Sequence, residues 1–238
     1  MAFEGPIVDH RELMLAHATA LFTHDSRENL VCVNDPAGDV APRFFLGMTA
    51  DGPLVMFGTD VDQATRDELA QIAARVALVP DVLTRALDPS PFEVILARTK
   101  PIARTWLGPA YLCPDDARRV LSAVPIDDDN CGLLRPLLDD WRLDVPVCQP
   151  MTALILEERA VAVCCSVRRT ETAHEAGVET AAPFRGRGHA AAAVSAWIRA
   201  VREANRLPLY STSWQNVASQ ALARKLGLLL FGNDLHIT

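Results

Sequence analysis

The sequence of 238 residues lacks any apolar run that approaches the ~18–20 residues that a membrane-spanning helix needs. Its first residues, MAFEGPIVDHRELM, have neither the basic nor the apolar segment of a secretory signal, so we expect a cytoplasmic protein. Internal repeats and low-complexity tracts are also missing. With 50% hydrophobic and 22% charged residues, the composition is that of a folded globular protein of one large or two small domains.

The six cysteines form no CxxC pair, and their spacing fits neither a zinc site nor a secreted disulfide framework. We therefore expect no metal, and we expect reduced thiols that pack as small hydrophobic groups. Cys164 and Cys165 are adjacent in an apolar run, so one is expected to face the core and the other the opposite face of a sheet.

Charge is unevenly distributed along the chain, which carries a formal net charge of −7. Residues 1–150 contain 13 Lys and Arg against 23 Asp and Glu, whereas residues 151–238 contain 10 against 7. An acidic body argues against nucleic acid as a partner, and a locally basic segment is suited to an anionic ligand.

The first half of the chain predicts helices and strands in alternation. Asp51-Gly52 is a natural turn between two strands, Thr65 and Glu68 have the spacing of a capping box, and Ser90 is placed to cap a helix that begins at Pro91. The expected helices cover residues 9–22, 59–79 and a segment from 90 onward, and the expected strands cover 30–33, 43–49 and 53–59. Residues 101–150 are rich in Pro and Asp and predict only a weak helix over 127–141, interrupted by Pro136.

The pattern is sharper after residue 150. Two apolar runs joined at Glu157-Glu158-Arg159 predict an antiparallel hairpin, and residues 174–181 predict a third strand. A loop rich in Arg and Gly follows, then a helix over about 189–204, a short strand, a helix that ends at Gly227, and one or two final strands. Strands that come first as a meander and then alternate with helices predict a mixed sheet.

The loop Arg185-Gly186-Arg187-Gly188-His189-Ala190 joins a strand to a helix. A helix begins with unpaired amides and a partial positive charge, and glycines let the backbone approach a ligand, so this arrangement favours a phosphate site. The motif is neither GxxxxGK[ST] nor GxGxxG, since Ala191 stands where the last glycine would be. A tight turn with surface arginines is the alternative interpretation.

The same loop matches the [Q/R]xxGx[G/A] signature of the GNAT superfamily of N-acetyltransferases, which lies between the fourth strand and the third helix of that fold. The upstream segment GVETAAPFRGRG resembles the fourth strand and its bulge. Downstream, Asn216, Ser219 and Lys225-Leu226-Gly227-Leu228 occupy the places of the family's next strand–helix segment. The resemblance covers about residues 147–238 and implies a mixed sheet flanked by helices that binds acyl-CoA.

By this resemblance, the backbone of Arg185, Gly186, Arg187, Gly188, His189 and Ala190 would bind the diphosphate of acetyl-CoA. The pantetheine arm would pair with the strand near Val178 and Thr180, and Asn216 and Ser219 would meet the pantetheine or the phosphate end. The resemblance also implies direct attack of an amine on the thioester, with a carboxylate that takes the proton of the amine.

Strand alternation places Glu175, Gly177 and Glu179 on one face. Glu175 resembles an acidic residue of many family members and is the first candidate for the base, with Glu179 the second; a surface or ion-paired glutamate is the alternative for both. His174 and His189 are weaker candidates. Two acids on one face would also suit a cationic amine.

The family's usual general acid is a Tyr at the place of Ala223, and the chain has only 2 Tyr, Tyr111 and Tyr210. Tyr210 is a substitute or a core aromatic. Trp197 is expected in the core, and Trp214 is a candidate to line the site. The missing Tyr puts the acid step in doubt and leaves CoA binding unaffected.

We therefore expect an α/β protein that transfers an acetyl group from acetyl-CoA to a primary amine, either a small cationic amine or a peptide amino group. The expected domains are an N-terminal α/β accessory or substrate-binding region (1–110), a linker or irregular lid (111–146) and a GNAT-like domain (147–238). A non-catalytic acyl-CoA-binding or sensor protein is the alternative, and a decayed second copy of the fold in 1–146 is a third option. Neither a membrane nor nucleic acid is expected as a partner, and a homodimer is left open.

Overall fold

The computed structural model describes residues 9–79, 81–114 and 123–238. The chain divides into two compact units. The first extends to Ala110 and includes Thr212–Gln215 and Leu230–Thr238, and the second comprises Tyr111–Ser211 and Asn216–Leu229. The expected linker or lid (111–146) therefore belongs to the second unit, and most of the last strand belongs to the first; residues 115–122 of that linker lie outside the described residues.

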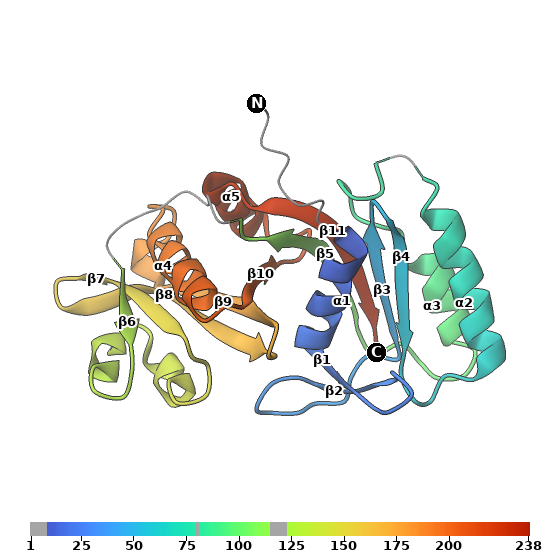
Figure 1. The fold of residues 1–238 in the computed structure, drawn as a ribbon, viewed down its shortest axis with the longest axis horizontal. Coiled ribbons are helices and arrows are strands. Elements are labelled where there is room, and N and C mark those ends of the chain that lie inside the picture. Colours follow the sequence, from blue (N-terminus) through green and yellow to red (C-terminus); the bar gives the residue numbers. More distant parts are fainter. Residues whose placement is uncertain (1–8, 80, 115–122) are drawn as a thin grey trace. The chain divides into compact units, whose positions relative to one another are not determined.

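The first unit is a sheet with helices on both faces (Figure 1). β3 pairs antiparallel with β4 and with β11, in the strand order β4-β3-β11-β5, and β1 and β2 form a separate antiparallel pair. Its helices are α1 (His10–Leu21), α2 (Gln63–Val76) and α3 (Ser90–Leu96), and its strands are β1 (Phe22–His24), β2 (Leu30–Val33), β3 (Phe44–Thr49), β4 (Gly52–Phe57), most of β5 (Thr105–Leu112) and most of β11 (Leu229–Ile237).

Side-chain alternation along β3 builds the two cores of this unit. Phe44 stacks on Phe92 of α3 with ring centroids 5.2 Å apart, within a cluster that includes Leu69 of α2. On the other face, a Cβ at Gly47 would collide with the side chain of Met14. Glycine at this position therefore lets α1 pack closely against β3.

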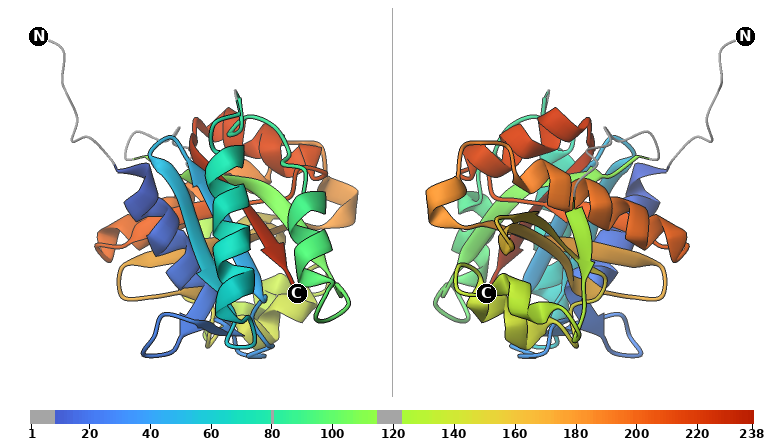
Figure 2. Two further views of the ribbon diagram at one scale, coloured as in Figure 1. Left: turned by 90° about the vertical axis from the view of Figure 1, so that its right-hand side faces the viewer. Right: turned by 90° about the vertical axis from the view of Figure 1, so that its left-hand side faces the viewer.

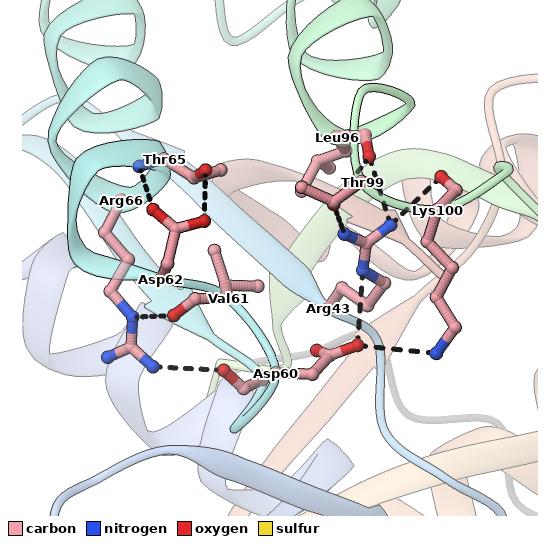
Figure 3. A network of polar contacts seen from close by, with 10 residues as sticks. Arg43, Asp60, Val61, Asp62, Thr65, Arg66, Leu96, Thr99 and Lys100 are labelled. Carbon is pink, nitrogen blue, oxygen red and sulfur yellow. Dashed lines mark hydrogen bonds and ion pairs between the residues drawn. The ribbon is translucent and has the colours of Figure 1, made fainter.

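A buried arginine connects the start of β3 to the end of α3 (Figure 3). The guanidinium of Arg43 donates to the carbonyls of Leu96 and Lys100, at 3.3 Å each, and to the hydroxyl of Thr99 at 2.6 Å. Asp60 lies 3.5 Å from its Nε and 3.4 Å from the Nζ of Lys100. A cation at the C-terminus of a helix is favourable because the last carbonyls carry partial negative charge.

The starts of two helices differ from those expected. Asp62 caps α2, since its carboxylate accepts the amide of Thr65 at 3.0 Å; the capping box predicted at Thr65 and Glu68 is wrong. Ser90 is the first residue of α3 and not its cap, and the carboxylate of Asp88 accepts its amide at 3.0 Å. Aspartate is as good a capping residue as serine or threonine, so Asp62 can cap α2, whereas α3 has Pro89 at its N-cap position and no side-chain cap.

The second unit is a mixed sheet in the order β10-β9-β8-β7-β6. Its antiparallel strands β6 to β9 are followed by a parallel partner, β10, so the predicted order β-β-β-loop-α-β-α is confirmed. The elements are β6 (Ala123–Ile126), η1 (Cys131–Leu134), η2 (Asp139–Asp144), β7 (Met151–Leu156), β8 (Arg159–Arg169), β9 (Ala173–Thr180), η3 (Ala182–Phe184), α4 (Ala190–Glu203), β10 (Leu207–Ser211) and α5 (Val217–Leu226).

Two layers cover this sheet (Figure 2, right). α4 packs on β7, β8 and β9, and Thr152 of β7 donates to the carbonyl of Ala193 at 2.8 Å. On the other face, Leu134 of η1 and Leu138, which directly precedes η2, belong to a core with Cys165. The helix expected over 127–141 is therefore two short 3-10 turns, because Pro136 cannot continue a helix.

Each of the five cysteines of the second unit is a thiol, and four of the five are buried. Cys164 and Cys165 are both fully buried on opposite faces of β8, and burial raises the pKa of the Cys164 thiol. Such thiols are protonated and unreactive at neutral pH. Among the described residues, no helix is both long enough and apolar enough to cross a bilayer.

Candidate active site

The strands β9 and β10 run side by side for three residues and then separate. The parallel ladder joins Leu207 to Ala173, Pro208 to His174 and Leu209 to Glu175. β9 continues to Thr180 with β8 as its partner on the other edge. The printed ladder between β9 and β10 therefore ends at Glu175, and we call the edge of β9 beyond it, which has no partner strand among the described residues, the notch.

After Glu175, backbone amide and carbonyl groups of β9 point to the edge that borders the notch. Ala181 donates its amide to Val161 of β8 at 3.0 Å, so the odd-numbered residues before it are expected to bond to β8 as well. The amide and carbonyl of Val178 then face the open edge. The carbonyl of Thr180 is already in use, because it accepts the Nε of Arg185 at 3.0 Å.

The loop between β9 and α4 has the backbone that an anion cradle needs. Gly186 and Gly188 have φ of 76° and 80°, in the left-handed region that glycine adopts without strain. Within residues 9–79, 81–114 and 123–238, no group accepts a hydrogen bond of ordinary geometry from the amides of residues 186–190. These amides precede a helix of 14 residues, whose dipole adds positive potential.

Three cations border this loop, and they differ in how they are held. Arg185 bonds to Thr180 and lies 3.8 Å from the carboxylate of Glu179, and the guanidinium of Arg187 lies 5.8 Å from the ring of Phe184. The Nζ of Lys225, from the last turn of α5, lies where a Cβ of Gly188 would be. Lys225 is exposed, and no carboxylate among the described residues pairs with it.

Glu175, the first candidate for the base, is 2% exposed. The hydroxyl of Ser211 donates to its Oε2 at 3.3 Å. Arg168 lies opposite it on β8, across a bulge at Val167. Burial, and secondarily the negative charge of Glu175, raises the pKa of the Cys113 thiol, so these two groups are close.

Glu179 is held by other protein groups. Its Oε2 accepts the indole N–H of Trp141 at 2.6 Å, and its Oε1 lies near Arg185. A Cβ at Gly177 would also contact Trp141, which confirms that Gly177 and Glu179 share a face. A carboxylate engaged in this way is the weaker candidate for a base.

His174 and His189, the weaker candidates for the base, each lie against other side chains of the protein. His174 is 8% exposed, and its Nδ1 lies 2.8 Å from the hydroxyl of Ser166, which accepts the indole N–H of Trp197 at 3.0 Å. The tautomer of His174 decides whether Nδ1 or the hydroxyl of Ser166 donates, and burial lowers the pKa of His174. His189 precedes α4, with its ring 6.2 Å from that of Phe184.

The start of α5 carries the remaining predicted site residues. The side chain of Asn216 caps the helix and accepts the amide of Ser219 at 3.0 Å. The hydroxyl of Ser219 lies 2.6 Å from that of Tyr210, and burial raises the pKa of Tyr210 to about 12. Ala223, one turn further along α5, is fully buried.

The two tryptophans singled out from the sequence are both hydrogen-bonded. Trp197 belongs to α4 and is fully buried, as expected. Trp214 belongs to the first unit, and its indole N–H donates to Asn233 at 3.0 Å. Sequence reasoning missed the cation of Lys225 and the contacts of Ser211 and Trp141, because each depends on residues distant in the chain. In the described parts of the chain, no three His, Cys, Asp or Glu side chains are grouped to hold a metal ion.

One stretch of the chain is similar to a known protein family. Residues 152–231 match the GNAT acetyltransferase family model. The chain therefore contains a GNAT acetyltransferase domain, as the resemblance of its loop and strands predicted. No curated protein matches the chain.

Solved structures of the same family have a similar fold. A GCN5-related N-acetyltransferase from Kribbella flavida is 14% identical, with 98% of this chain and 96% of that chain covered and a TM-score of 0.50. A GNAT-family protein from Novosphingobium aromaticivorans is 17% identical, and the similarity covers 57% of this chain and 65% of that one, with a TM-score of 0.45. An acetyltransferase of the GNAT family from Colwellia psychrerythraea is 10% identical, with 90% and 82% covered and a TM-score of 0.48. The Kribbella match establishes the mixed α/β fold with a large sheet flanked by helices.

Proposed function

We propose that the protein transfers an acetyl group from acetyl-CoA to a primary amine. The observation that carries this proposal is the run of amides at residues 186–190 that have no acceptor among the described residues. This run lies within the matched domain and follows the strand that borders the notch. A diphosphate would accept hydrogen bonds from these amides, with the ammonium of Lys225 beside Gly188. The backbone of Arg185 and Arg187 would form part of the loop that binds the diphosphate, and their side chains would add positive charge near it.

The notch would receive the rest of acetyl-CoA. The pantetheine arm carries amides that would pair with the edge of β9 at Val178 and near Thr180, in the manner of an added strand. Asn216 and Ser219 lie at the start of α5 and would border this arm. This path would leave the thioester close to Glu175, where β9 and β10 separate.

Glu175 would act as the general base in this mechanism. A primary amine with an unperturbed pKa of ~10.4 is protonated at neutral pH and must lose a proton before it attacks. The Glu175 carboxylate would take that proton, directly or through a water molecule, while Ser211 holds its Oε2. The nitrogen then attacks the carbonyl carbon, and the C–S bond breaks to release CoA.

The acceptor that we propose is a small cationic amine or a peptide amino group. The excess of Asp and Glu in residues 1–150 supports a positively charged acceptor, because an acidic surface attracts cations. A second candidate function, an acyl-CoA sensor without catalysis, is favoured by Ala223, which replaces the usual acid.

Turnover separates the two functions. Purified protein is mixed with acetyl-CoA and a panel of polyamines, aminoglycosides, lysine derivatives and peptides, and release of the CoA thiol is followed, with mass spectrometry of the products. Acetylated amine is the expected result. Tight binding of acetyl-CoA with no turnover on any amine would favour the sensor, and failure to bind acetyl-CoA would contradict both.

A further inference from the structure

A β-bulge in β8 changes which side chain lies opposite Glu175. The register between β8 and β9 shifts between Ser166 and Arg168, so Val167 is an extra residue and Arg168 lies directly opposite Glu175. Without the extra residue, Val167 would oppose Glu175, and Arg168 would point to the other face of the sheet. Bulges of this kind re-aim a side chain. Here the bulge turns an arginine to the face that carries Glu175.

Gly177 makes room for the extra residue. A Cβ at Gly177 would collide with the Cγ1 of Val167 and would lie 3.3 Å from the ring of Trp141. Val167 packs against the hydrophobic core on this face, which includes Cys165. The bulge is therefore anchored by its own side chain, and the absence of a side chain at Gly177 allows it.

Glu175 is flanked on both sides by the neighbouring strands. β9 lies between β8 and β10, and the hydroxyl of Ser211 in β10 donates to the Oε2 of Glu175 at 3.3 Å. On the other side, residues that are directly opposed in an antiparallel pair have Cβ atoms ~4.5–5.5 Å apart, which is within reach of an arginine. Arg168 is partly buried, and its Nε is fully covered, whereas the next residue, Arg169, is exposed.

The burial of Glu175 gives this placement a consequence. Only 2% of the residue is exposed, and a buried carboxylate is costly unless a partner compensates its charge. The hydroxyl of Ser211 is neutral, whereas a guanidinium keeps its positive charge and can hold a carboxylate in a fixed orientation.

We propose that Arg168 is a positioning residue that holds the carboxylate of Glu175 in the orientation of a general base. This inference rests on the proposed function, in which Glu175 takes the proton of the amine. A carboxylate has about four lone-pair sites, so contacts with Arg168 and Ser211 leave sites for that proton. Glu175 remains the catalytic residue, and Arg168 acts through it.

A double-mutant cycle of thermal stability tests the contact without turnover. The variants are Arg168→Met, Glu175→Gln and their combination. If the two side chains interact, the change in melting temperature of the double variant should differ from the sum of the single changes by about 2 °C or more. Arg169→Met is the matched control, because Arg169 lies opposite His174 and not Glu175. Its effect should add to that of Glu175→Gln.

Steady-state kinetics provides a readout that a merely structural role would not change. Arg168→Met should lower kcat about tenfold with little change in the KM for acetyl-CoA, and Arg168→Lys, which keeps the charge, should recover part of this loss. In the Glu175→Gln background, Arg168→Met should cause no further loss, since no base is left to position. Arg169→Met should leave kcat within about twofold of the wild type.

The bulge itself can be tested by a compensating pair. Gly177→Ala should lower kcat in the same way as Arg168→Met, because the added Cβ displaces Val167 and with it the bulge. Val167→Ala removes the colliding methyl group, so the double variant Gly177→Ala/Val167→Ala should regain most of the lost activity. Thermal unfolding shows which of these variants are folded, and the Arg168 variants test the inference even if Gly177→Ala is not.

The outcomes separate this inference from the proposed function. Additive stability changes for Arg168→Met and Glu175→Gln would overturn the inference while acetyl transfer stands. A further tenfold loss of kcat from Arg168→Met in the Glu175→Gln background would overturn it too. A wild-type protein that acetylates no amine would overturn the proposed function, and the stability cycle would still decide whether Arg168 holds Glu175.

Discussion

The ammonium of Lys225 lies where a Cβ of Gly188 would be, so the last turn of α5 brings a cation to the loop that precedes α4. Neither residue alone would define a binding site. Together they place a positive charge beside a left-handed glycine and a run of amides with no acceptor among the described residues. This is the arrangement that the diphosphate of a CoA thioester would require.

Replacement of Lys225 with alanine should weaken acetyl-CoA binding about three- to tenfold, as expected for one exposed charge next to an anion. The effect should shrink as salt is added, because exposed charges are screened. Arg224→Ala is the matched control, since it removes the same charge from the neighbouring position of α5. Titration calorimetry at two salt concentrations measures the affinity for acetyl-CoA and its dependence on salt. An equal loss of affinity in Lys225→Ala and Arg224→Ala would contradict a specific contact between Lys225 and the diphosphate.

The two loop glycines should respond differently to substitution. A side chain at Gly188 strains a residue with φ of 80° and displaces Lys225, so Gly188→Val should abolish detectable acetyl-CoA binding. A Cβ at Gly186 meets nothing within 4 Å, so Gly186→Ala should cost only the strain of its φ, about 1–2 kcal/mol. Thermal unfolding shows whether each variant is folded, and a folded Gly188→Val protein with unchanged affinity would count against the cradle.

Glu175→Gln should lower kcat by about a hundredfold or more while the KM for acetyl-CoA stays nearly constant, because the amide cannot take a proton. Glu179→Gln is its isosteric control on the same face of β9. Since Trp141 and Arg185 already engage Glu179, this second change should affect kcat only slightly. A larger loss in Glu179→Gln than in Glu175→Gln would reverse the assignment of the base.

A buried aspartate of the first unit should control stability in acid. Asp234 is fully buried, with its Oδ2 2.9 Å from the Nε2 atoms of both His17 and His236. Burial alone would raise its pKa, but the charges and hydrogen bonds of these histidines lower it to about 2. A carboxylate with a lowered pKa contributes stability above its unfolded value of ~3.9, and this contribution disappears as pH falls toward 2.

The free energy of unfolding should therefore decrease by about 2 kcal/mol from this group between pH 5 and pH 2. Asp234→Asn should be less stable at pH 6 but should show a shallower decrease over this range. Urea unfolding at each pH measures the difference. Parallel curves for wild type and Asp234→Asn would show that Asp234 is not the group responsible.

Local sequence signals predicted most elements of the second unit. Glu157 and Glu158 adopt positive φ at the predicted hairpin turn, and Gly227 ends α5 with a φ of 72°. The Arg/Gly loop, with its two glycines in the left-handed region, was likewise visible in the sequence. These features depend on residues that are neighbours in the chain, and such signals are strong where turn chemistry and periodicity agree.

Contacts between distant segments could not be predicted in the same way. Strand alternation placed Glu175 and Glu179 on the same face, and only the fold shows that Ser211 contacts Glu175 whereas Trp141 contacts Glu179. The placement of the last strand with β3 also depends on tertiary pairing. Its residues alone allowed one or two short strands, whereas the structure has one strand of 9 residues.

The most direct test of the account is the response of the backbone amides of residues 186–190 to the diphosphate. In a nuclear magnetic resonance titration, acetyl-CoA should shift these amide signals strongly, whereas S-acetylpantetheine, which lacks the diphosphate, should leave them in place and perturb β9 near Val178. Largest shifts at other sites, or equal shifts of the loop amides with both compounds, would contradict the proposed site.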